Sequence, residues 1–233
     1  MPGHFITFEG GEGAGKSTQI TLLKRFLESC GKTVVVTREP GGSPGAEKIR
    51  SLLLSGGAKD LGPRGEAMLF AAARADHVDS TIQPALKRGA WVLCDRYADS
   101  TRVYQGEAGV DEDYLKLLET AAVAGVRPDM TILIDVPPDI GLKRVAKRSE
   151  SDDSGGPDRF EGEALAVHER RRNLFLKLAE EEAYRFKVVD GAKDQAFVEK
   201  AIRDAVRDAF SRDLAPKGRR AANKVISSPE KTV

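Results

Sequence analysis

The chain has 233 residues, of which 37 are lysine or arginine and 36 are aspartate or glutamate, so its formal net charge is +1. This length suits a single α/β domain with one core. The near-neutral charge gives no electrostatic reason to expect a nucleic-acid duplex or an anionic membrane as a partner. The opening residues contain no signal-like segment, and no apolar run is long enough to span a bilayer. We therefore expect a soluble cytoplasmic protein that acts on small molecules.

Five short runs of β-branched and aromatic residues predict strands at residues 4–9, 32–39, 90–95, 130–136 and 186–190. Apolar residues at helical spacing predict helices near residues 16–30, 64–88, 111–124, 138–147, 161–184 and 194–210. Apolar strands that alternate with helices are typical of a parallel sheet covered by helices on both faces. The predicted fold class is therefore α/β, with one domain over residues 1–210.

The carboxyl-terminal segment differs from the rest of the chain. From Ser211 onward the sequence is basic and has no sustained apolar period. We expect residues 211–233 to form a disordered tail, because such a segment cannot bury enough apolar surface to offset the entropy of ordering. Contact of this tail with nucleic acid is possible, but a solvated tail is the favoured interpretation.

A phosphate-binding loop follows directly after the first predicted strand. Its sequence GGEGAGKST satisfies the pattern G-x-x-x-x-G-K-[ST], and a predicted helix begins at once. The glycines let backbone N–H groups surround phosphate oxygens, the lysine reaches the β- and γ-phosphates, and the serine hydroxyl can bind Mg²⁺. We therefore expect Mg-ATP or a related triphosphate to bind at Gly10, Gly11, Glu12, Gly13, Ala14, Gly15, Lys16, Ser17 and Thr18.

Two pairs of residues could recognise the second substrate. Arg38 and Glu39 are expected at the carboxyl end of the second strand, where ligands of open α/β sheets bind; the alternative is an exposed ion pair. Phe70 and Arg74 lie four residues apart on a predicted helix, so a ring and a planar donor could together hold a nucleobase. A core phenylalanine beside a surface arginine is the commoner explanation of that second pair.

A third group follows the strand at residues 90–95. This strand ends in Asp95 and Arg96, which can act on Mg²⁺ and on the acceptor phosphate. The alternative for Asp95 is a helix cap or a turn residue. The polar residues that come next are Ser100, Thr101, Tyr104 and Gln105.

Several segments together resemble the bacterial thymidylate kinase family, in order from about residue 4 to about residue 210. They are FITFEGGEGAGKST, TREPGG, AEKIRSLLL, EAMLFAAAR, DRYADST with YQG, and RPDMTILIDVPPDIGLKR. The resemblance implies the P-loop nucleoside-monophosphate-kinase fold, with a five-stranded parallel sheet and a lid. It also implies a homodimer that transfers the γ-phosphoryl group of Mg-ATP to dTMP, giving dTDP and ADP for dTTP synthesis.

The same resemblance implies roles for individual residues. The positions that match the family's dTMP site are Arg38, Glu39, Arg50, Phe70, Arg74, Arg96, Ser100, Thr101, Tyr104 and Gln105. Among them, Phe70 looks like the residue that stacks on thymine, and Arg74 and Gln105 resemble those that hydrogen-bond its edge. Arg38 and Arg96 resemble the pair that holds the monophosphate.

Residues 148–162 match the position of the family's lid over ATP, although their Ser, Asp and Gly content alone would favour a passive linker. Some relatives carry a catalytic arginine in the P-loop, and this chain does not. Arg148 and Arg159 of the lid are therefore the expected source of positive charge at the transferring group. The implied catalytic residues are Lys16, Asp95, Arg96, Arg148 and Arg159, and the implied metal ligands are Ser17 and Asp95.

Two other functions remain open from the residues alone. A kinase of another small acceptor would not need the set formed by Phe70, Arg74 and Gln105. A GTPase-type switch should carry an N-K-x-D motif after a strand, whereas the only Asn-Lys pair, Asn223–Lys224, lies in the tail and is followed by Val-Ile.

Overall fold

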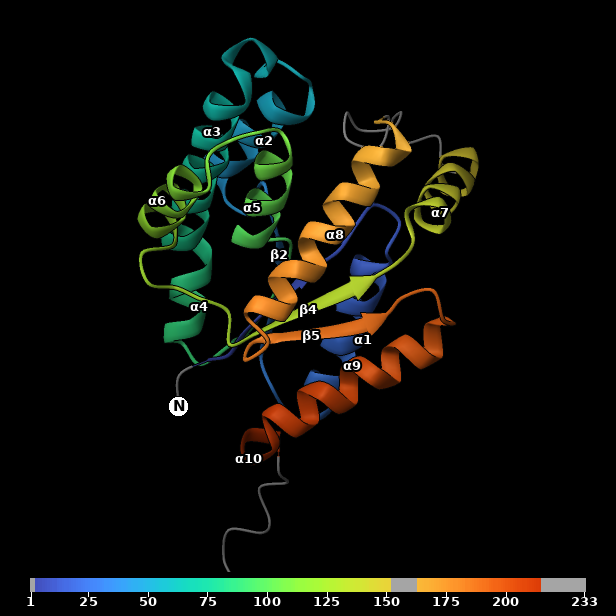
Figure 1. Cartoon of the computed structure of the whole chain (residues 1–233). Coiled ribbons are helices and arrows are strands. Elements are labelled where there is room, and N and C mark those ends of the chain that lie inside the picture. Colours follow the sequence, from blue (N-terminus) through green and yellow to red (C-terminus); the bar gives the residue numbers. More distant parts are fainter. Residues whose placement is uncertain (1–2, 152–162, 215–233) are drawn as a thin grey trace, which may run out of the picture.

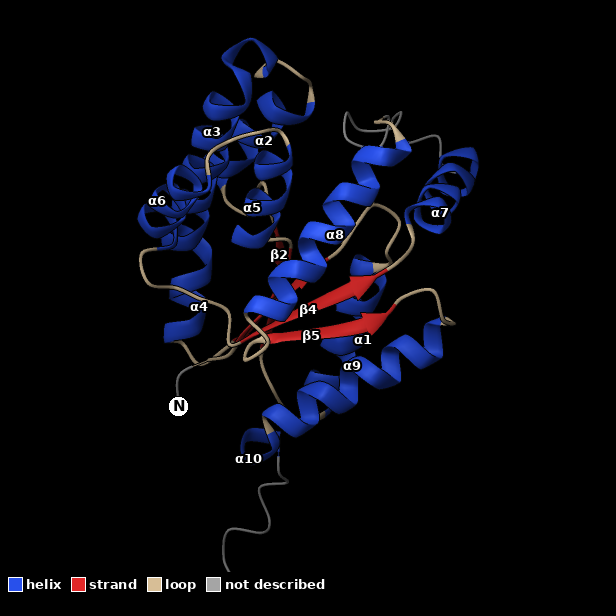
Figure 2. Ribbon diagram, in the orientation of Figure 1, coloured by secondary structure: helices blue, strands red, loops and turns tan. Residues whose placement is uncertain are grey.

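The computed structural model describes residues 3–151 and 163–214. Within these residues, five strands form one sheet in the order β2-β3-β1-β4-β5, and every neighbouring pair is parallel (Figures 1 and 2). The strands are β1 (Phe5–Glu9), β2 (Val34–Arg38), β3 (Trp91–Asp95), β4 (Met130–Asp135) and β5 (Phe186–Asp190). The predicted α/β class and the five-stranded parallel sheet are confirmed.

Helices cover both faces of this sheet (Figure 1). The α-helices of the described residues are α1 (Lys16–Ser29), α2 (Pro44–Leu54), α3 (Gly62–His77), α4 (Gln83–Lys87), α5 (Ala98–Glu107), α6 (Glu112–Val123), α7 (Pro138–Ser151), α8 (Leu165–Glu181), α9 (Gln195–Ala209) and α10 (Ser211–Leu214). A 3₁₀ turn, η1 (Lys59–Leu61), precedes α3, and a π turn, η2 (Val78–Ile82), joins α3 to α4. Helices α1 and α9 pack on one face of the sheet, and α4, α5 and α8 pack on the other.

Strand β1 lies at the centre of the sheet, and its side chains alternate between the two faces. Ile6 and Phe8 are fully buried among residues of α1 and α9, and each contributes about 1.5–3 kcal/mol by leaving water. Phe5 belongs to the cluster on the opposite face, together with residues of η2 and α4. Thr7 and Glu9 point to that second face as well, so polar groups enter the interior beside α5.

The structure differs from the sequence-based expectations in its helices. Helices α2 and α5 were not predicted from periodicity, and the single helix expected over residues 64–88 is divided into α3, η2 and α4. Helix α7 continues to Ser151, so Arg148 lies in the last turn of that helix. None of the helices in the described residues is long and apolar enough to cross a membrane.

The domain also continues past the boundary expected at residue 210. Ser211–Leu214 form the short helix α10, and Leu214 packs against the core cluster of α1 and α9. His4 at the other end of the chain lies 3.1 Å from the Asp213 carboxylate. Residues 211–214, which were expected in the tail, are therefore part of the folded domain; residues 215–233, and residues 152–162 of the predicted lid, lie outside the described residues.

Candidate active site

Residues 10–15 connect β1 to α1 and follow a path that requires glycine at several positions. Gly10 and Gly13 have φ angles of 139° and 66°, which L side chains rarely adopt. A Cβ atom at Gly13 would lie 2.1 Å from the Gly141 carbonyl oxygen, at the start of α7. The loop therefore lies closely against α7 and turns back toward α1, as the predicted phosphate-binding loop requires.

Lys16, the first residue of α1, is held across this loop. Its Nζ donates hydrogen bonds to the carbonyl oxygens of Gly10 and Gly11, at 3.1 and 3.0 Å. Burial, and then the nearby Arg96 guanidinium, lower the pKa of Lys16 below its ordinary value. The ammonium group is thus fixed in place and partly desolvated, which strengthens its attraction to an anion.

The loop opens onto a pocket of about 330 Å³, called here the donor pocket. It is lined by Glu12, Gly13, Ala14, Gly15, Lys16, Ser17, Thr18, Arg38, Glu39, Arg50, Asp95, Arg96 and Arg148. All of the predicted ATP-binding residues from Glu12 to Thr18 therefore face one cavity. Arg148 reaches the same cavity from α7, whereas Arg159 lies outside the described residues.

The two predicted metal ligands meet at the wall of the donor pocket. Ser17 comes from the first turn of α1 and Asp95 from the end of β3, yet the Ser17 hydroxyl donates to Asp95 Oδ2 at 2.8 Å. A hydroxyl and a carboxylate oxygen are hard donors, which suit Mg²⁺ that keeps waters and phosphate oxygens as its other ligands. This pair of residues therefore fits a Mg-nucleotide.

A second pocket, of about 100 Å³, adjoins the first and is called here the acceptor pocket. Its lining consists of Glu12, Glu39, Pro40, Arg50, Leu54, Phe70, Arg74, Arg96, Tyr97, Ser100, Thr101, Tyr104 and Gln105. It includes every predicted dTMP-binding residue except Arg38. Glu12, Glu39, Arg50 and Arg96 line both pockets, so ligands in the two cavities would meet at these residues.

Arg74 is fixed by a buried network at the inner end of the acceptor pocket. Its side chain is only 3% exposed, and its Nε donates to Glu39 Oε2 at 2.8 Å. Its Nη2 donates to Thr101 Oγ1 at 2.9 Å and to the Tyr97 carbonyl oxygen at 3.1 Å. The alternative of a surface arginine beside a core phenylalanine is therefore wrong for Arg74, and Phe70 is only partly buried.

Glu39 has a second buried partner that the sequence did not indicate. His77 Nδ1 lies 3.0 Å from Glu39 Oε1, and His77 Nε2 lies 2.6 Å from Thr37 Oγ1. The alternative of an exposed pair between Glu39 and Arg38 is thus also wrong. The signal in the sequence was a histidine three residues after Arg74, on the same face of the predicted helix.

Arg96 lies where the two pockets meet. Its Nη2 donates to Glu12 Oε1 at 2.7 Å, and its Nη1 donates to Ser100 Oγ at 3.2 Å. The Tyr104 hydroxyl donates to the same Glu12 oxygen at 2.8 Å. Although burial opposes ionisation of Glu12, the charges of Arg96 and Lys16 and the Tyr104 bond outweigh it and lower its pKa to about 2. Glu12 is therefore an anion that holds the Arg96 guanidinium.

Arg38 is the one predicted dTMP-binding residue that does not line the acceptor pocket. Its side chain is 55% exposed, and its Nη2 donates to Glu47 Oε1 at 3.1 Å, so its ion pair is with Glu47 of α2. Glu47 also accepts a bond from the Gly42 N–H at 2.9 Å. Arg50, from the same helix, donates to the Pro40 carbonyl oxygen at 2.6 Å. Helix α2, which was not predicted, therefore fixes the loop after β2.

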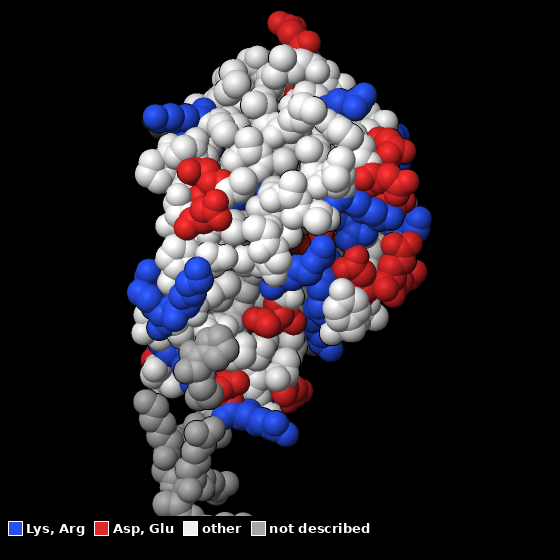
Figure 3. Space-filling model, turned by 90° about the vertical axis from the view of Figure 1, so that its left-hand side faces the viewer, with Lys and Arg blue, Asp and Glu red and all other residues white. Residues whose placement is uncertain are grey.

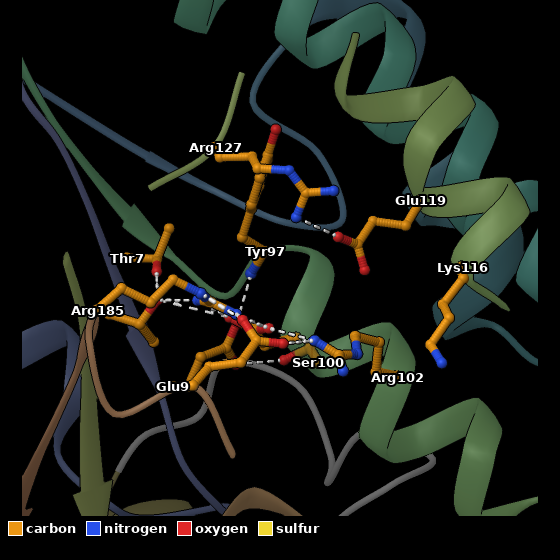
Figure 4. Close-up of polar contacts among 12 residues, drawn as sticks. Thr7, Glu9, Tyr97, Ser100, Arg102, Lys116, Glu119, Arg127 and Arg185 are labelled. Atoms are coloured by element: carbon orange, nitrogen blue, oxygen red, sulfur yellow. Dashed lines mark hydrogen bonds and ion pairs between the residues drawn. The ribbon is translucent and has the colours of Figure 1, made fainter. Parts of the chain in front are cut away.

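Glu9 is a further residue at this site that the sequence reading missed. It ends β1 directly before the phosphate-binding loop and is fully buried. Its carboxylate accepts bonds from the Tyr97 N–H at 2.8 Å and from the Ser100 hydroxyl at 2.6 Å (Figure 4). The signal in the sequence was an acidic residue at the end of an apolar strand, where a buried charge requires partners.

Comparisons with known proteins show which family the chain belongs to. Residues 8–202 match a family model described as thymidylate kinase. The chain is 51% identical over 207 residues to a thymidylate kinase of a Bradyrhizobium species, covering 88% of this chain and 90% of that protein. It is 49% identical over 221 residues to a thymidylate kinase of Nitrobacter winogradskyi, covering 94% and 95% of the two chains. The family model spans most of the chain and the relatives are aligned over nearly their whole length, so this chain belongs to the thymidylate kinase family.

Proposed function

We propose that the protein is a cytoplasmic enzyme that transfers the γ-phosphoryl group of ATP to dTMP, giving dTDP and ADP for dTTP synthesis. The observation that carries this proposal is the pair of adjoining pockets. One is built around the phosphate-binding loop, the other contains the residues expected for a thymine base, and Arg96 and Glu12 stand between them. Membership of the thymidylate kinase family supports the same substrate and reaction.

On the donor side, the N–H groups of the phosphate-binding loop and the Lys16 ammonium group bind the β- and γ-phosphates. Ser17 and Asp95 would hold Mg²⁺, which supplies neutralisation of phosphate charge when it is bound. Arg148, which lines the donor pocket, and Arg159 would supply the remaining positive charge near the transferring group. A side chain from α7 is thus available on the donor side even without an arginine in the loop.

On the acceptor side, Phe70 would stack on thymine while Arg74 and Gln105 hydrogen-bond its edge. Because Nε and Nη2 of Arg74 already bond protein groups, Nη1 is the nitrogen left to face the base. Arg96 would hold the monophosphate at the junction of the pockets. A phosphate oxygen is already anionic at pH 7, so the transfer needs alignment and charge stabilisation and no strong general base.

The decisive test is an assay of ADP release with ATP and a panel of nucleoside monophosphates. We expect dTMP to be phosphorylated most efficiently, because Phe70, Arg74 and Gln105 of the acceptor pocket are the residues expected to recognise the ring and the edge of thymine. Turnover of AMP or GMP as efficient as that of dTMP would point to another acceptor and would contradict the proposal.

We also propose that two copies of the chain associate through α3 and α6. Met68 on α3 and Leu117 on α6 are 53% and 66% exposed, which is unusual for large apolar side chains. Figure 3 turns the side with these helices toward the viewer; the middle of its upper half is uncharged, and charged side chains lie around it. Sedimentation should give a dimer mass for the parent and a monomer mass for Leu117→Lys. A monomeric parent would contradict this part of the proposal.

A further inference from the structure

Glu9 is costly to bury, and the structure shows which groups offset that cost. Burial first, and then the carboxylate of Asp99, raise the pKa of Glu9 to about 7, although Arg96, Ser100 and the Tyr97 N–H act in the opposite direction. Asp99 is itself paired with Arg185, whose two terminal nitrogens donate to it at 2.7 and 2.8 Å. The Glu9 carboxylate therefore depends on the first turn of α5 for its partners.

Glu9, at the end of β1, completes the amino-terminal cap of helix α5. Tyr97 precedes the first residue of this helix, and none of its own side-chain atoms caps the helix. Glu9 accepts from the Tyr97 N–H and from the side chain of Ser100, which is the third residue of the helix. In a capping box a residue of the helix itself supplies the bond to the cap N–H. Here β1 supplies it, so the position of α5 depends on β1.

The same strand also fixes Arg96. The Arg96 N–H donates to the Phe8 carbonyl oxygen at 2.9 Å, and Arg96 has a φ of 69°, a conformation that costs on the order of 1–3 kcal/mol for a residue other than glycine. Its guanidinium Nη1 donates to Ser100 Oγ, and Ser100 in turn donates to Glu9. Ser100 can offer a lone pair to Arg96 because its proton is directed at Glu9.

We propose that Glu9 is a positioning residue that orients Arg96 for the acceptor monophosphate by fixing the direction of the Ser100 hydroxyl. Glu9 does not line either pocket, so it acts through Ser100 and does not touch the substrate. The proposal rests on the proposed function, in which Arg96 holds the monophosphate. Phosphorylation of dTMP by the parent protein tests that function separately.

The central variant is Glu9→Gln, which has the same shape but reverses one hydrogen bond. Its amide oxygen must face the Tyr97 N–H, so its NH₂ group points at Ser100 and donates to it. Ser100 can then no longer direct its proton at residue 9, and the negative charge near Arg96 is lost. At pH 8.5, where Glu9 is ionised in the folded parent, we expect the KM for dTMP to rise about tenfold, while the KM for ATP stays within about twofold of the parent value.

A double-mutant cycle separates positioning from general loss of structure. If Glu9 acts through Ser100, then Glu9→Gln in a Ser100→Ala background should change the KM for dTMP by less than about twofold. Full additivity of the two changes would overturn the proposal, and so would a Glu9→Gln protein with an unchanged KM for dTMP.

Glu182→Gln is the matched control. Glu182 accepts bonds from Arg102 and Arg185 in the same polar network, and neither of these arginines bonds Arg96 or Ser100. It should lower the melting temperature and leave the KM for dTMP unchanged; an equal rise in that KM would show that general loosening of the network explains the effect. If Glu9→Gln does not fold, Glu9→Asp replaces it. Aspartate is too short to reach both partners, so its KM for dTMP should also rise, and an unchanged KM overturns the proposal.

Discussion

The donor pocket and the acceptor pocket adjoin, but the chain builds them by different means. The donor pocket is formed mainly by one continuous segment, residues 12–18, whose phosphate-binding groups are largely backbone N–H groups. The acceptor pocket is formed by side chains of α2, α3 and α5 and of the loops after β1, β2 and β3, and a buried ion pair between Arg74 and Glu39 holds two of them. Backbone groups keep their positions when a neighbouring side chain changes, whereas each partner of a buried ion pair depends on the other. Changes on the donor side should therefore affect catalysis or substrate binding but not stability, and changes on the acceptor side should affect both function and stability.

The largest effect is expected for Lys16→Ala, on the donor side. The substitution removes the charge that would follow the transferring phosphoryl group, so kcat should fall by about 10³-fold or more. Its melting temperature should stay close to that of the parent, because the ammonium group is partly desolvated and its loss leaves only two carbonyl groups beside an open pocket. Lys24→Ala, an exposed change on the same helix, is the control. Near-normal turnover of Lys16→Ala would mean that the phosphate-binding loop is assigned wrongly.

Arg159→Ala should have the next largest effect, a fall in kcat of about 10³-fold with nearly unchanged affinity for dTMP, because the interaction forms mainly in the transition state. Arg148→Ala, in the last turn of α7, should either share this effect or raise the KM for ATP, since Arg148 lines the donor pocket. Steady-state kinetics with ATP and dTMP varied separately distinguishes these outcomes. If both variants turn over like the parent, neither arginine supplies charge to the transferring group.

Arg74→Ala tests the acceptor pocket, which Arg74 lines. Loss of the guanidinium should weaken dTMP binding by about 1–3 kcal/mol, or roughly 5- to 150-fold, because the edge of the base loses its partner. It also leaves Glu39 with a buried charge and one partner fewer, so unfolding should become easier by about 3–5 kcal/mol. Thermal unfolding and titration with dTMP measure the two effects. If Arg74→Ala melted at the same temperature as Lys16→Ala, changes at the two pockets would not differ in their effect on stability, and this part of the comparison would be wrong.

The same difference explains what the sequence could predict. The sheet was predictable because its strands are short apolar runs, and the donor loop was predictable because its chemistry lies in nine consecutive residues. Helix α5 was not, because several of the residues it buries are polar, including Asp99, Thr101 and Gln105, and these give no apolar period.

The sequence offered separate pairs of residues for the second substrate, and only the family resemblance joined them into one acceptor pocket. Glu39 and Arg74 are 35 residues apart in the chain, and Glu9 and Ser100 are 91 apart, so no local pattern connects them. The resemblance gave the residues of the pocket, but it did not indicate the buried partners His77 and Glu9. It also grouped Arg38 with Arg96, whereas Arg38 lies on the donor wall and pairs with Glu47.

The smallest predicted effect concerns the pH dependence of stability, and Glu9→Gln isolates it. The pKa of Glu9 is about 7 in the folded protein, against an ordinary value of 4.5, because burial and Asp99 disfavour the charged form. Below pH 4.5 the carboxyl is protonated in both states, so Glu9 contributes no pH dependence there. Between pH 4.5 and 7 the unfolded chain releases this proton and the folded protein retains it, so the contribution of Glu9 to stability falls as the pH rises.

Glu9→Gln has no such proton. The difference between the free energies of unfolding of parent and variant should therefore change across this pH range. From pH 5 to pH 7.5 the parent should lose on the order of 1–3 kcal/mol relative to the variant, which amounts to a few degrees of melting temperature. Other carboxyl groups titrate alike in both proteins and cancel in the difference. Glu12, whose pKa is lowered to about 2, acts in the opposite direction and only in more acidic solution. A constant gap between the two melting temperatures from pH 5 to 7.5 would mean that Glu9 stays ionised in the folded protein, held by α5 as firmly as Glu12 is held by Arg96.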